Sequence, residues 1–451
     1  MGLVIAACLT GCGGGAGASD TTTAADDGGC QDCATRPNWH EDVAPLVEAN
    51  CRYCHTDGGI APFSMDSYDE THPWSAYMAQ QVSNRIMPPW HAVETDQCTP
   101  PFPFRHDARM PQEAIDTFVA WANAGAPEGD PANAAPLPSP PETDLADPTV
   151  TIPMPGSITI EGEGSTLDFF HCVSFDPGND DDIYLTGLQV QPGNLEIAHH
   201  VLVYVAESAQ SAAWPNGIQE DCGGGPGINN ATLIAGWVPG AMPTRPPDDV
   251  GIRVPAGARL VFNYHYHATG GGPQVDDSTA LLLKYETSAP MWTSYFELVG
   301  APGEGTILTA PFLIPAGASN HEEIVEWTVP DFPGLEVRLW TAANHMHKVG
   351  VDMTTSLVRD GEETCLLQTP NWDFDWQRLY SYDVPIEGAV QVLPGDVIRV
   401  RCTYENTLEN TALLETLGEL GESAPIDVGL GEGTLDEMCL AGIGVAYTPA
   451  P

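Results

Sequence analysis

Hydrophobic positions between residues 36 and 130 recur at helical spacing. Val43, Leu46 and Val47 fall on one face of a predicted short helix. A second helix is predicted over residues 111–124, with an apolar stripe formed by Ile115, Phe118, Val119 and Ala122. This block is also rich in Trp, and we expect it to form a small all-α domain.

After residue 148 the pattern changes to strict alternation of apolar and polar positions. Strands are predicted at residues 149–152, 157–160 and 336–340, with Gly, Pro and Asp turns between strands. Residues 372–376 alternate in the same way and predict one more strand, with a core-facing aromatic side. We expect two all-β halves that divide near residues 288–291.

These patterns predict a multidomain chain in which an all-α block precedes two all-β, jelly-roll-like sandwiches. The Pro-rich spacer that joins the α block to the first sandwich shows no apolar period, which is typical of a semi-rigid linker. The predicted boundaries are 1–35 for a signal and flexible tether, 36–130 for the α domain, 131–147 for the linker, and 148–289 and 290–451 for the sandwiches.

Composition narrows the class of protein. The chain has 451 residues, with 15 Lys and Arg against 62 Asp and Glu, a net charge of −47. Nucleic-acid binding needs basic surface, so the balance excludes a nucleic-acid-binding body. The 46 Gly and 41 Pro favour turn-rich β structure over long helices.

The first residues and the cysteines predict export. Twelve Cys indicate an oxidising compartment. The apolar run at residues 3–9 is followed by Leu9-Thr10-Gly11-Cys12, which resembles a bacterial lipobox and implies lipidation of Cys12. No positive residue precedes the run, so an accidental apolar terminus is the alternative. We expect a periplasmic or cell-surface protein, anchored to the outer membrane by lipid alone.

The pentad Cys51-Arg-Tyr-Cys54-His55 predicts one covalent haem c. Two thiols at this spacing can form thioethers to both haem vinyl groups, and the following His can reach the iron. A structural disulfide beside an unrelated His is the alternative interpretation.

The block around this pentad resembles class I cytochrome c domains. In that family a Met before Pro supplies the sixth iron ligand, which Met87 in Met87-Pro88 matches. His91 is the competing candidate. The remaining methionines of the block are expected to be packing residues, namely Met65, Met78 and Met110.

Metal-ligand residue types recur in the β region. His345 and His347 are two residues apart on a predicted strand, so they share a face and can chelate one ion. His199 and His200 are adjacent, and they need a twist or a bulge to bind together. Imidazole suits copper and zinc, whereas a thioether such as that of Met438 selects Cu(I).

In order along the chain, these residues resemble the copper type II ascorbate-dependent monooxygenases over about residues 148–447. The resemblance implies an electron-storing copper held by His199, His200 and His265. It implies a second, oxygen-binding copper held by His345, His347 and Met438. Two disulfides follow from the same resemblance, Cys172 with Cys222 and Cys402 with Cys439.

One alternative metal site is considered, and several His and Cys residues have no role in the copper interpretation. A single three-His zinc hydrolase site fits the residue types, but it leaves the other His and Met438 unexplained. His267 has no ligand role and is expected to support the site or the fold. His171 and His321 are expected to be surface or packed residues. The cysteines without an assigned partner are Cys30, Cys33, Cys98 and Cys365.

The substrate is only partly constrained. In peptide-processing members of the family, an Arg, an Asn and a Tyr hold the substrate carboxylate and backbone. The matching positions here are Ala343, Leu440 and Gly442, which cannot do so. A peptide ending in glycine is therefore disfavoured, while the negative charge of the chain would attract cationic molecules.

Together these features predict a haem-fused copper monooxygenase that hydroxylates a C–H bond of a small organic substrate with O₂. Electrons would come through the haem, from a periplasmic donor, or from an ascorbate-like reductant, and would reach the storage copper first. The alternative is a non-catalytic periplasmic lipoprotein that binds copper and haem and transfers electrons to a partner.

Overall fold

The computed structural model describes residues 36–139, 143–162, 167–269, 272–300, 306–308, 311–419, 421–431, 433 and 435–450. Residues Pro37–Pro451 form one compact unit. The predicted lipidation site Cys12, the tether, Cys30 and Cys33 lie outside the described residues. Among the described helices, none is long and apolar enough to cross a membrane.

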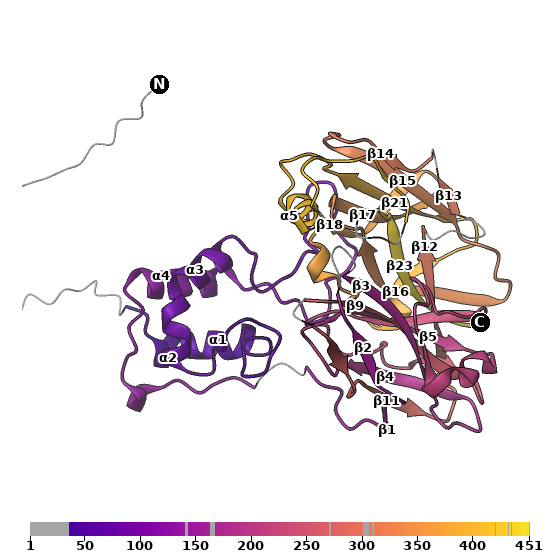
Figure 1. The fold of residues 1–451 in the computed structure, drawn as a ribbon, viewed down its shortest axis with the longest axis horizontal. Coiled ribbons are helices and arrows are strands. Elements are labelled where there is room, and N and C mark those ends of the chain that lie inside the picture. The colour runs from indigo at the N-terminus through magenta and orange to yellow at the C-terminus, as the bar shows by residue number, and fades with distance from the viewer. Residues whose placement is uncertain are drawn as a thin grey trace, which may run out of the picture. The chain divides into compact units, whose positions relative to one another are not determined.

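The first part of this unit is helical, as predicted (Figure 1). Its elements are η1 (Trp39–Val43), α1 (Ala44–Asn50), α2 (Tyr68–Thr71), η2 (His72–Trp74), α3 (Ser75–Ser83), α4 (Gln112–Asn123) and η3 (Pro131–Asn133). Helix α4 confirms the predicted helix, with Pro111 as its N-cap residue. It buries Ile115, Phe118 and Trp121 in a core shared with Val43 and Val47.

In the described part of the chain, nine strands form the largest sheet. Along the sheet the order is β1, β11, β4, β8, β12, β23, β16 and β19, with β20 also paired to β16. Their bounds are β1 Val150–Pro153, β4 Ile183–Gln191, β8 Val250–Val254, β11 Ala280–Glu286, β12 Trp292–Val299, β16 Leu335–His345, β19 Tyr380–Ser381, β20 Val390–Val392 and β23 Leu440–Pro449.

Two five-stranded sheets accompany it among the described residues (Figure 1). The first, in the order β6-β3-β9-β5-β7, consists of β6 Ile218–Gln219, β3 Asp168–Phe175, β9 Arg259–His267, β5 Ala198–Ala206 and β7 Ala231–Trp237. The second, in the order β13-β15-β21-β17-β18, consists of β13 Thr306–Leu308, β15 His321–Thr328, β21 Val397–Tyr404, β17 Gly350–Arg359 and β18 Glu362–Thr369.

Short elements complete the described fold. Two-stranded sheets pair β2 (Ile158–Ile160) with β10 (Gln274–Asp276), and β14 (Leu313–Ile314) with β22 (Val428–Gly429). The helical turns and the last helix are η4 Ala209–Ala213, η5 Pro215–Gly217, η6 Phe374–Trp376, η7 Ile386–Gly388 and α5 Thr411–Glu419.

The two β halves have separate cores but share one sheet. Strand β11 ends at Glu286 and β12 begins at Trp292, on either side of residues 288–291. The larger core lies mainly in the first half and the other in the second. However, β8 pairs in parallel with β12, Val250 opposite Trp292, so the nine-stranded sheet runs through both halves. This pairing satisfies backbone groups that two isolated sandwiches would leave at open edges.

Part of the N-terminal block belongs to the second β half. Trp90, Ala92 and Phe104 are buried in the core of that half. Phe104 forms a β-bridge with Tyr382, and Cys98 is bonded to Cys365. The predicted α domain over 36–130 therefore contains an inserted segment that packs elsewhere. Spacing alone gave no sign of it, because the segment is irregular.

The predicted strand over residues 372–376 is wrong. Phe374–Trp376 form the 3-10 turn η6, and the Asp373 side chain accepts a hydrogen bond from the Asp375 backbone N–H. Asp side chains that bond to the local backbone favour turns over extended structure. The aromatic residues of this turn lie beside the metal-ligand candidates described below.

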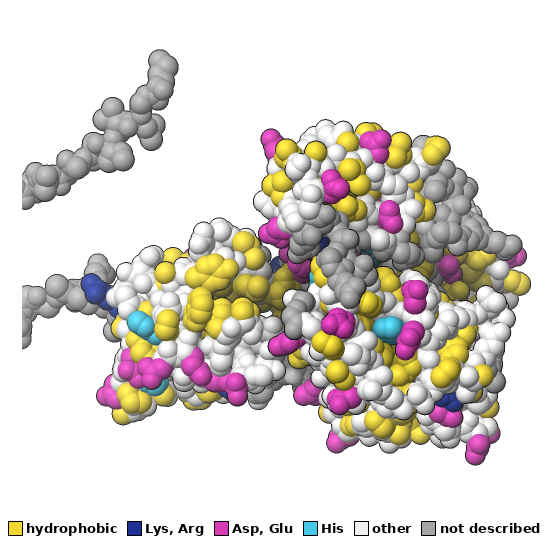
Figure 2. Space-filling model, in the orientation of Figure 1, with side chains coloured by type: hydrophobic (Ala, Val, Ile, Leu, Met, Phe, Trp, Pro, Cys, Tyr) yellow, Lys and Arg dark blue, Asp and Glu magenta, His cyan; other side chains and the backbone are white. Residues whose placement is uncertain are grey.

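Carboxylates dominate the charged surface. Figure 2 shows Asp and Glu side chains scattered over the visible face, with few Lys or Arg among them. This distribution follows from the 62 acidic and 15 basic residues of the chain.

Candidate metal centres

The first predicted set of ligands lies on two neighbouring strands. Strand β5 pairs with β9, and His200 lies directly opposite His265. The register shifts between Ala198 and His200, so the pair contains a β-bulge at His199. The bulge that adjacent His residues were predicted to need is confirmed, and it lets both side chains turn to one side.

The three side chains converge on one point. Their ligand atoms all lie within 4.8 Å of one another. The Nδ1 atoms of His199 and His200 are 3.0 Å apart. Two nitrogens bound at about 2.0–2.1 Å to one ion are about 2.8–3.4 Å apart at angles between 90° and 109°. The spacing of this pair therefore fits a shared metal ion.

The tautomer of His265 also fits. Its Nε2 lies 2.9 Å from Asp168 Oδ1, and a carboxylate can only accept, so Nε2–H donates. Its Nδ1 keeps the lone pair and is buried without a hydrogen-bond partner among the described residues. An unpartnered buried acceptor beside two other imidazoles is the feature expected of a metal ligand.

Burial favours the neutral forms of His199 and His200. It lowers the pKa of His199 to about 3, with His265, His267 and Lys348 acting in the same direction. Burial, together with the neighbouring His residues, also lowers the pKa of His200 well below its usual value. Neutral imidazoles have free lone pairs at neutral pH, so protons do not compete with a metal.

His267 supports the first set through Asp168. Its Nδ1 lies 2.9 Å from the same Asp168 Oδ1 that holds His265. The Phe170 ring stacks on the His265 imidazole, with the two ring centroids 4.4 Å apart. Asp168 and Phe170 thus fix the orientation of His265. Neither was singled out from sequence, since nothing in the spacing shows that β3 lies beside β9.

The second set begins at the end of β16. The rings of His345 and His347 have centroids 5.2 Å apart. His345 Nδ1–H donates to Gln377 Oε1 at 2.6 Å, and His347 Nδ1–H donates to the Asp436 carbonyl at 3.0 Å. Both partners are acceptors, which leaves each Nε2 as the free donor of a lone pair. Burial lowers the pKa of both, to about 3 for His345.

Glu437 connects Met438, the third predicted ligand of the second set, to the backbone around His347. Met438 is buried, and its neighbour Glu437 is completely buried. The Glu437 carboxylate accepts four backbone N–H bonds, from His347, Val349, Gly350 and Met438, at 2.7, 3.0, 3.2 and 3.0 Å. Burial raises the pKa of Glu437 to about 8, and these donors act against that rise. The carboxylate holds the backbone of Met438 beside the His347 turn.

Three uncharged residues lie beside His345. Leu440 of β23 is directly opposite His345 of β16, and Ala343 is opposite Gly442. The face next to His345 therefore carries no charge at these three positions. It offers no partner for a carboxylate.

The predicted disulfides are confirmed. Cys172 is bonded to Cys222, and Cys402 to Cys439, the residue after Met438. The Cys98–Cys365 bond was not predicted, because its partners are 267 residues apart.

Two further His residues of the β region, His171 and His321, are packed or paired with neighbouring side chains. His171 is buried against Tyr266. His321 lies 2.9 Å from Glu323.

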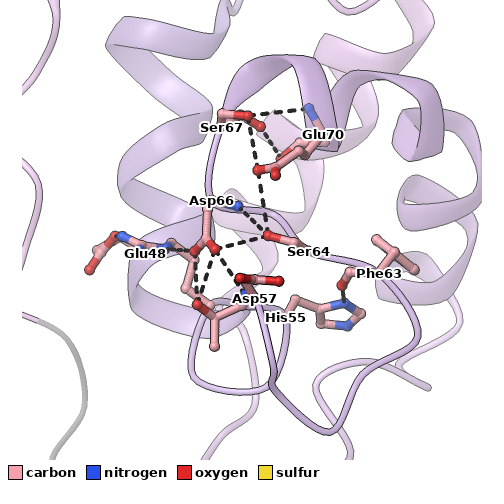
Figure 3. A network of polar contacts seen from close by, with 11 residues as sticks. Glu48, His55, Asp57, Phe63, Ser64, Asp66, Ser67 and Glu70 are labelled. Atoms are coloured by element: carbon pink, nitrogen blue, oxygen red, sulfur yellow. Dashed lines mark hydrogen bonds and ion pairs between the residues drawn. The ribbon is translucent and has the colours of Figure 1, made fainter.

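The predicted haem motif follows α1 directly, with Cys51 as the C-cap residue of that helix. Cys51 and Cys54 are free thiols whose pKa values burial raises to about 12 and 11. His55 Nδ1–H donates to the Phe63 carbonyl at 3.0 Å (Figure 3), which leaves Nε2 free for an iron ion. Its ring also packs 4.5 Å from that of Phe63.

Asp66 holds the loop after the motif. Figure 3 shows its carboxylate at the centre of a polar network. It accepts from the Asp57 backbone N–H at 3.0 Å, from Ser64 Oγ at 3.0 Å and from Arg52 Nε at 2.9 Å. These bonds lower the pKa of Asp66 to about 2, and the Asp57 bond has the largest effect.

The sixth haem ligand stays a prediction. Met65, Met78 and Met110 are buried in the helical core, as expected of packing residues. Met87 is half-buried and is not part of that core. The His91 backbone N–H donates to Tyr380 Oη at 3.3 Å, so this residue lies against the second β half.

Comparison with known proteins supports the copper interpretation. Residues 321–444 match the family model of the copper type II ascorbate-dependent monooxygenase C-terminal domain. That range includes His345, His347 and Met438. This part of the chain is similar to the copper type II ascorbate-dependent monooxygenases.

Curated relatives belong to the same group of monooxygenases. Peptidyl-glycine alpha-amidating monooxygenase A of Xenopus laevis is 25% identical over 268 residues, 57% of this chain and 25% of the relative. Dopamine beta-hydroxylase of Canis lupus familiaris is 25% identical over 215 residues, 46% of this chain and 31% of the relative. The matched part of the chain thus spans between a quarter and a third of each of these monooxygenases.

Solved structures add nothing to this relationship. The major capsid protein P2 of bacteriophage PM2 matches with a TM-score of 0.22 and 12% identity, over 66% of this chain and 97% of the capsid protein. A similarity this low has no bearing on the fold or the function.

Proposed function

We propose that the protein is a copper-dependent monooxygenase that hydroxylates a C–H bond of a small organic substrate with O₂. One ion would be held by His199, His200 and His265, and the other by His345, His347 and Met438. Copper bound there would supply the electrons and the oxygen activation for the reaction. Among the chain's own residues, Asp168, Gln377 and the Asp436 carbonyl accept hydrogen bonds that fix the tautomers of three of these imidazoles.

The convergence of three imidazoles carries this proposal. Their ligand atoms lie within 4.8 Å of one another, and the buried His265 Nδ1 has no partner among the described residues. A zinc hydrolase site would use one such cluster and needs no second pair. Here the second pair lies in the segment that matches the copper family model, and Glu437 bonds to the backbones of both His347 and Met438, a buried thioether residue. Thioether ligands favour copper over zinc.

Electrons would reach the copper pair through a covalent haem, an ascorbate-like reductant, or both. The haem would be bound through Cys51 and Cys54, with His55 as an iron ligand and Met87 as the candidate sixth ligand. Support for a link comes from Arg378, which follows the His345 partner Gln377. It lies close enough to the Tyr53 hydroxyl of the haem motif to lower that group's pKa, against the larger effect of burial.

Export is the second part of the proposal. Three disulfides in the described chain are typical of an oxidising compartment. We propose that the protein is periplasmic or at the cell surface, attached by a lipid on Cys12. Lipidation can be checked by mass spectrometry of the mature N-terminus, with Cys12→Ser as the control.

Isotope transfer from oxygen tests the proposed reaction. Copper-loaded protein, ascorbate and ¹⁸O₂ are incubated with ethylbenzene, 2-phenylethylamine and phenylpropanoic acid, which share a benzylic C–H bond but differ in charge. We expect an ¹⁸O-labelled benzylic alcohol from at least one of them, and none from His345→Ala protein. Ascorbate oxidation that yields only water or peroxide with all three probes would favour the electron-transfer protein instead.

A further inference from the structure

One short segment reaches both candidate centres. Trp372 Nε1–H donates to the His347 carbonyl at 3.1 Å, and Gln377 accepts from His345. Between them, the Phe374 ring lies 5.0 Å from the His199 ring and 5.7 Å from the His347 ring, measured between centroids. Because His199 and His347 belong to different β halves, Phe374 lies between the two sets of ligands.

Several contacts hold the Phe374 ring in this place. Lys348 Nζ lies 4.7 Å from the ring centroid and pairs with Asp375 Oδ1 at 3.1 Å. The Gln377 side chain donates to the Phe374 carbonyl at 3.0 Å. A cation above an aromatic face and a fixed backbone restrict the ring more than apolar packing alone. The ring is therefore a positioned element of the site.

An aromatic ring in contact with an imidazole on each side changes how the two centres can communicate. It provides a continuous path of π systems from His199 to His347. The ring contacts one imidazole from each set, at centroid distances of 5.0 and 5.7 Å, so the path consists of two ring-to-ring steps. The Phe374 side chain has no polar group, so it cannot bind or release a proton along this path.

We propose that Phe374 is the bridge through which electrons pass between the two metal centres. This inference rests on the proposed function, in which both centres hold copper. With copper bound, the centre held by His199, His200 and His265 would supply one electron. The centre held by His345, His347 and Met438 would accept it, with O₂ as the final oxidant and an ascorbate-like compound as the reductant. No bond forms or breaks at Phe374.

The test is single-turnover oxidation followed by rapid-freeze EPR. The full chain, made without haem so that no other internal donor is present, is loaded with copper, reduced, freed of ascorbate and mixed with O₂. The rate at which the first-centre Cu(II) signal appears is compared in wild type, Phe374→Leu and Phe374→Tyr. Trp376→Leu is the matched control, because that indole is in the same turn but lies by Gly240.

We expect Phe374→Leu to bind both coppers and to lower the rate of this electron transfer by about tenfold. Phe374→Tyr retains the ring and should stay within about twofold of wild type, as should Trp376→Leu. An unchanged rate in copper-replete Phe374→Leu would overturn the bridge and leave the proposed function standing. Wild-type protein that binds no copper at these centres would instead overturn both proposals.

Discussion

At the scale of single residues, acceptor groups decide which nitrogen of each candidate ligand is free. Asp168 accepts a hydrogen bond from Nε2–H of His265. In the second pair it is Nδ1–H that donates, from His345 to Gln377 and from His347 to the Asp436 carbonyl. The first centre would thus use Nδ1 of His265, and the second would use Nε2. Such partners outside the ligand set commonly set ligand orientation and metal affinity.

Asp168 offers a direct test of this role. Asp168→Asn removes the charge that holds His265 and His267, so the first centre should bind copper about 10–100-fold more weakly. The second centre should be unaffected. Competition with a Cu(I) chelator measures both affinities, and Asp181→Asn, at an exposed surface carboxylate, is the control. Equal affinity in Asp168→Asn and wild type would show that this carboxylate does not support the site.

The ligand candidates could be found from sequence, but their supporting residues could not. One His doublet, two HxH patterns and a Met in a fixed order are visible as letters along the chain. Asp168 and Gln377 are ordinary residues whose partners are distant in sequence, and only the pairing of β3 with β9 brings Asp168 to His265. Glu437 was visible beside Met438, yet nothing in the spacing showed its four backbone partners.

At the scale of elements, one buried carboxylate joins the turn after β16 to the segment before β23. Glu437→Gln keeps the shape but presents an amide N–H₂ to backbone N–H donors. The free energy of unfolding should fall by about 3 kcal/mol, because buried donors lose their acceptor.

The second centre should also lose copper before the first in Glu437→Gln. Urea unfolding and copper titration measure the two effects, with the exposed Glu387→Gln as control. Unchanged stability together with normal copper binding would contradict this account.

The loop after the haem motif should respond to pH through Asp66. Its folded-state pKa is lowered from 3.8 to about 2, so its stabilising effect is present above pH 4 and is lost as the pH falls through 2. Asp66→Asn should cost about 1 kcal/mol at pH 6, a small value because the carboxylate is partly exposed and screened.

The difference between wild type and Asp66→Asn should then shrink between pH 4 and pH 2. Denaturant midpoints measured across this range follow it, and Asp69→Asn, an exposed neighbour, is the matched control. A difference that does not change with pH would rule out the carboxylate network as its cause.

At the scale of the whole molecule, local patterns predicted the elements better than their assembly. The alternation at 336–340 and the helical stripe of 111–124 correspond to β16 and α4. The strand pairing of β8 with β12 and the packing of Trp90 and Phe104 in the second β half depend on contacts between distant parts of the chain. The turn at Phe374 was missed because alternating aromatic and acidic residues also suit a strand.

The Cys98–Cys365 disulfide should contribute to the stability of this assembly. It closes a loop across 267 residues and holds the inserted segment of the N-terminal block against the second β half. Replacing both cysteines by Ala should lower the unfolding free energy by about 2–5 kcal/mol. Thermal unfolding with and without a reductant checks this expectation. A double variant as stable as oxidised wild type would refute it.

The central claim is that the β region holds two coppers in two distinct sites. Metal and haem analysis of exported protein, matured with covalent haem, tests it most directly in wild type, His265→Ala and Met438→Ala. We predict two coppers and one haem per wild-type chain, with the first site weakened by His265→Ala and the second by Met438→Ala. Zinc in place of copper, or copper content indifferent to both substitutions, would contradict the account.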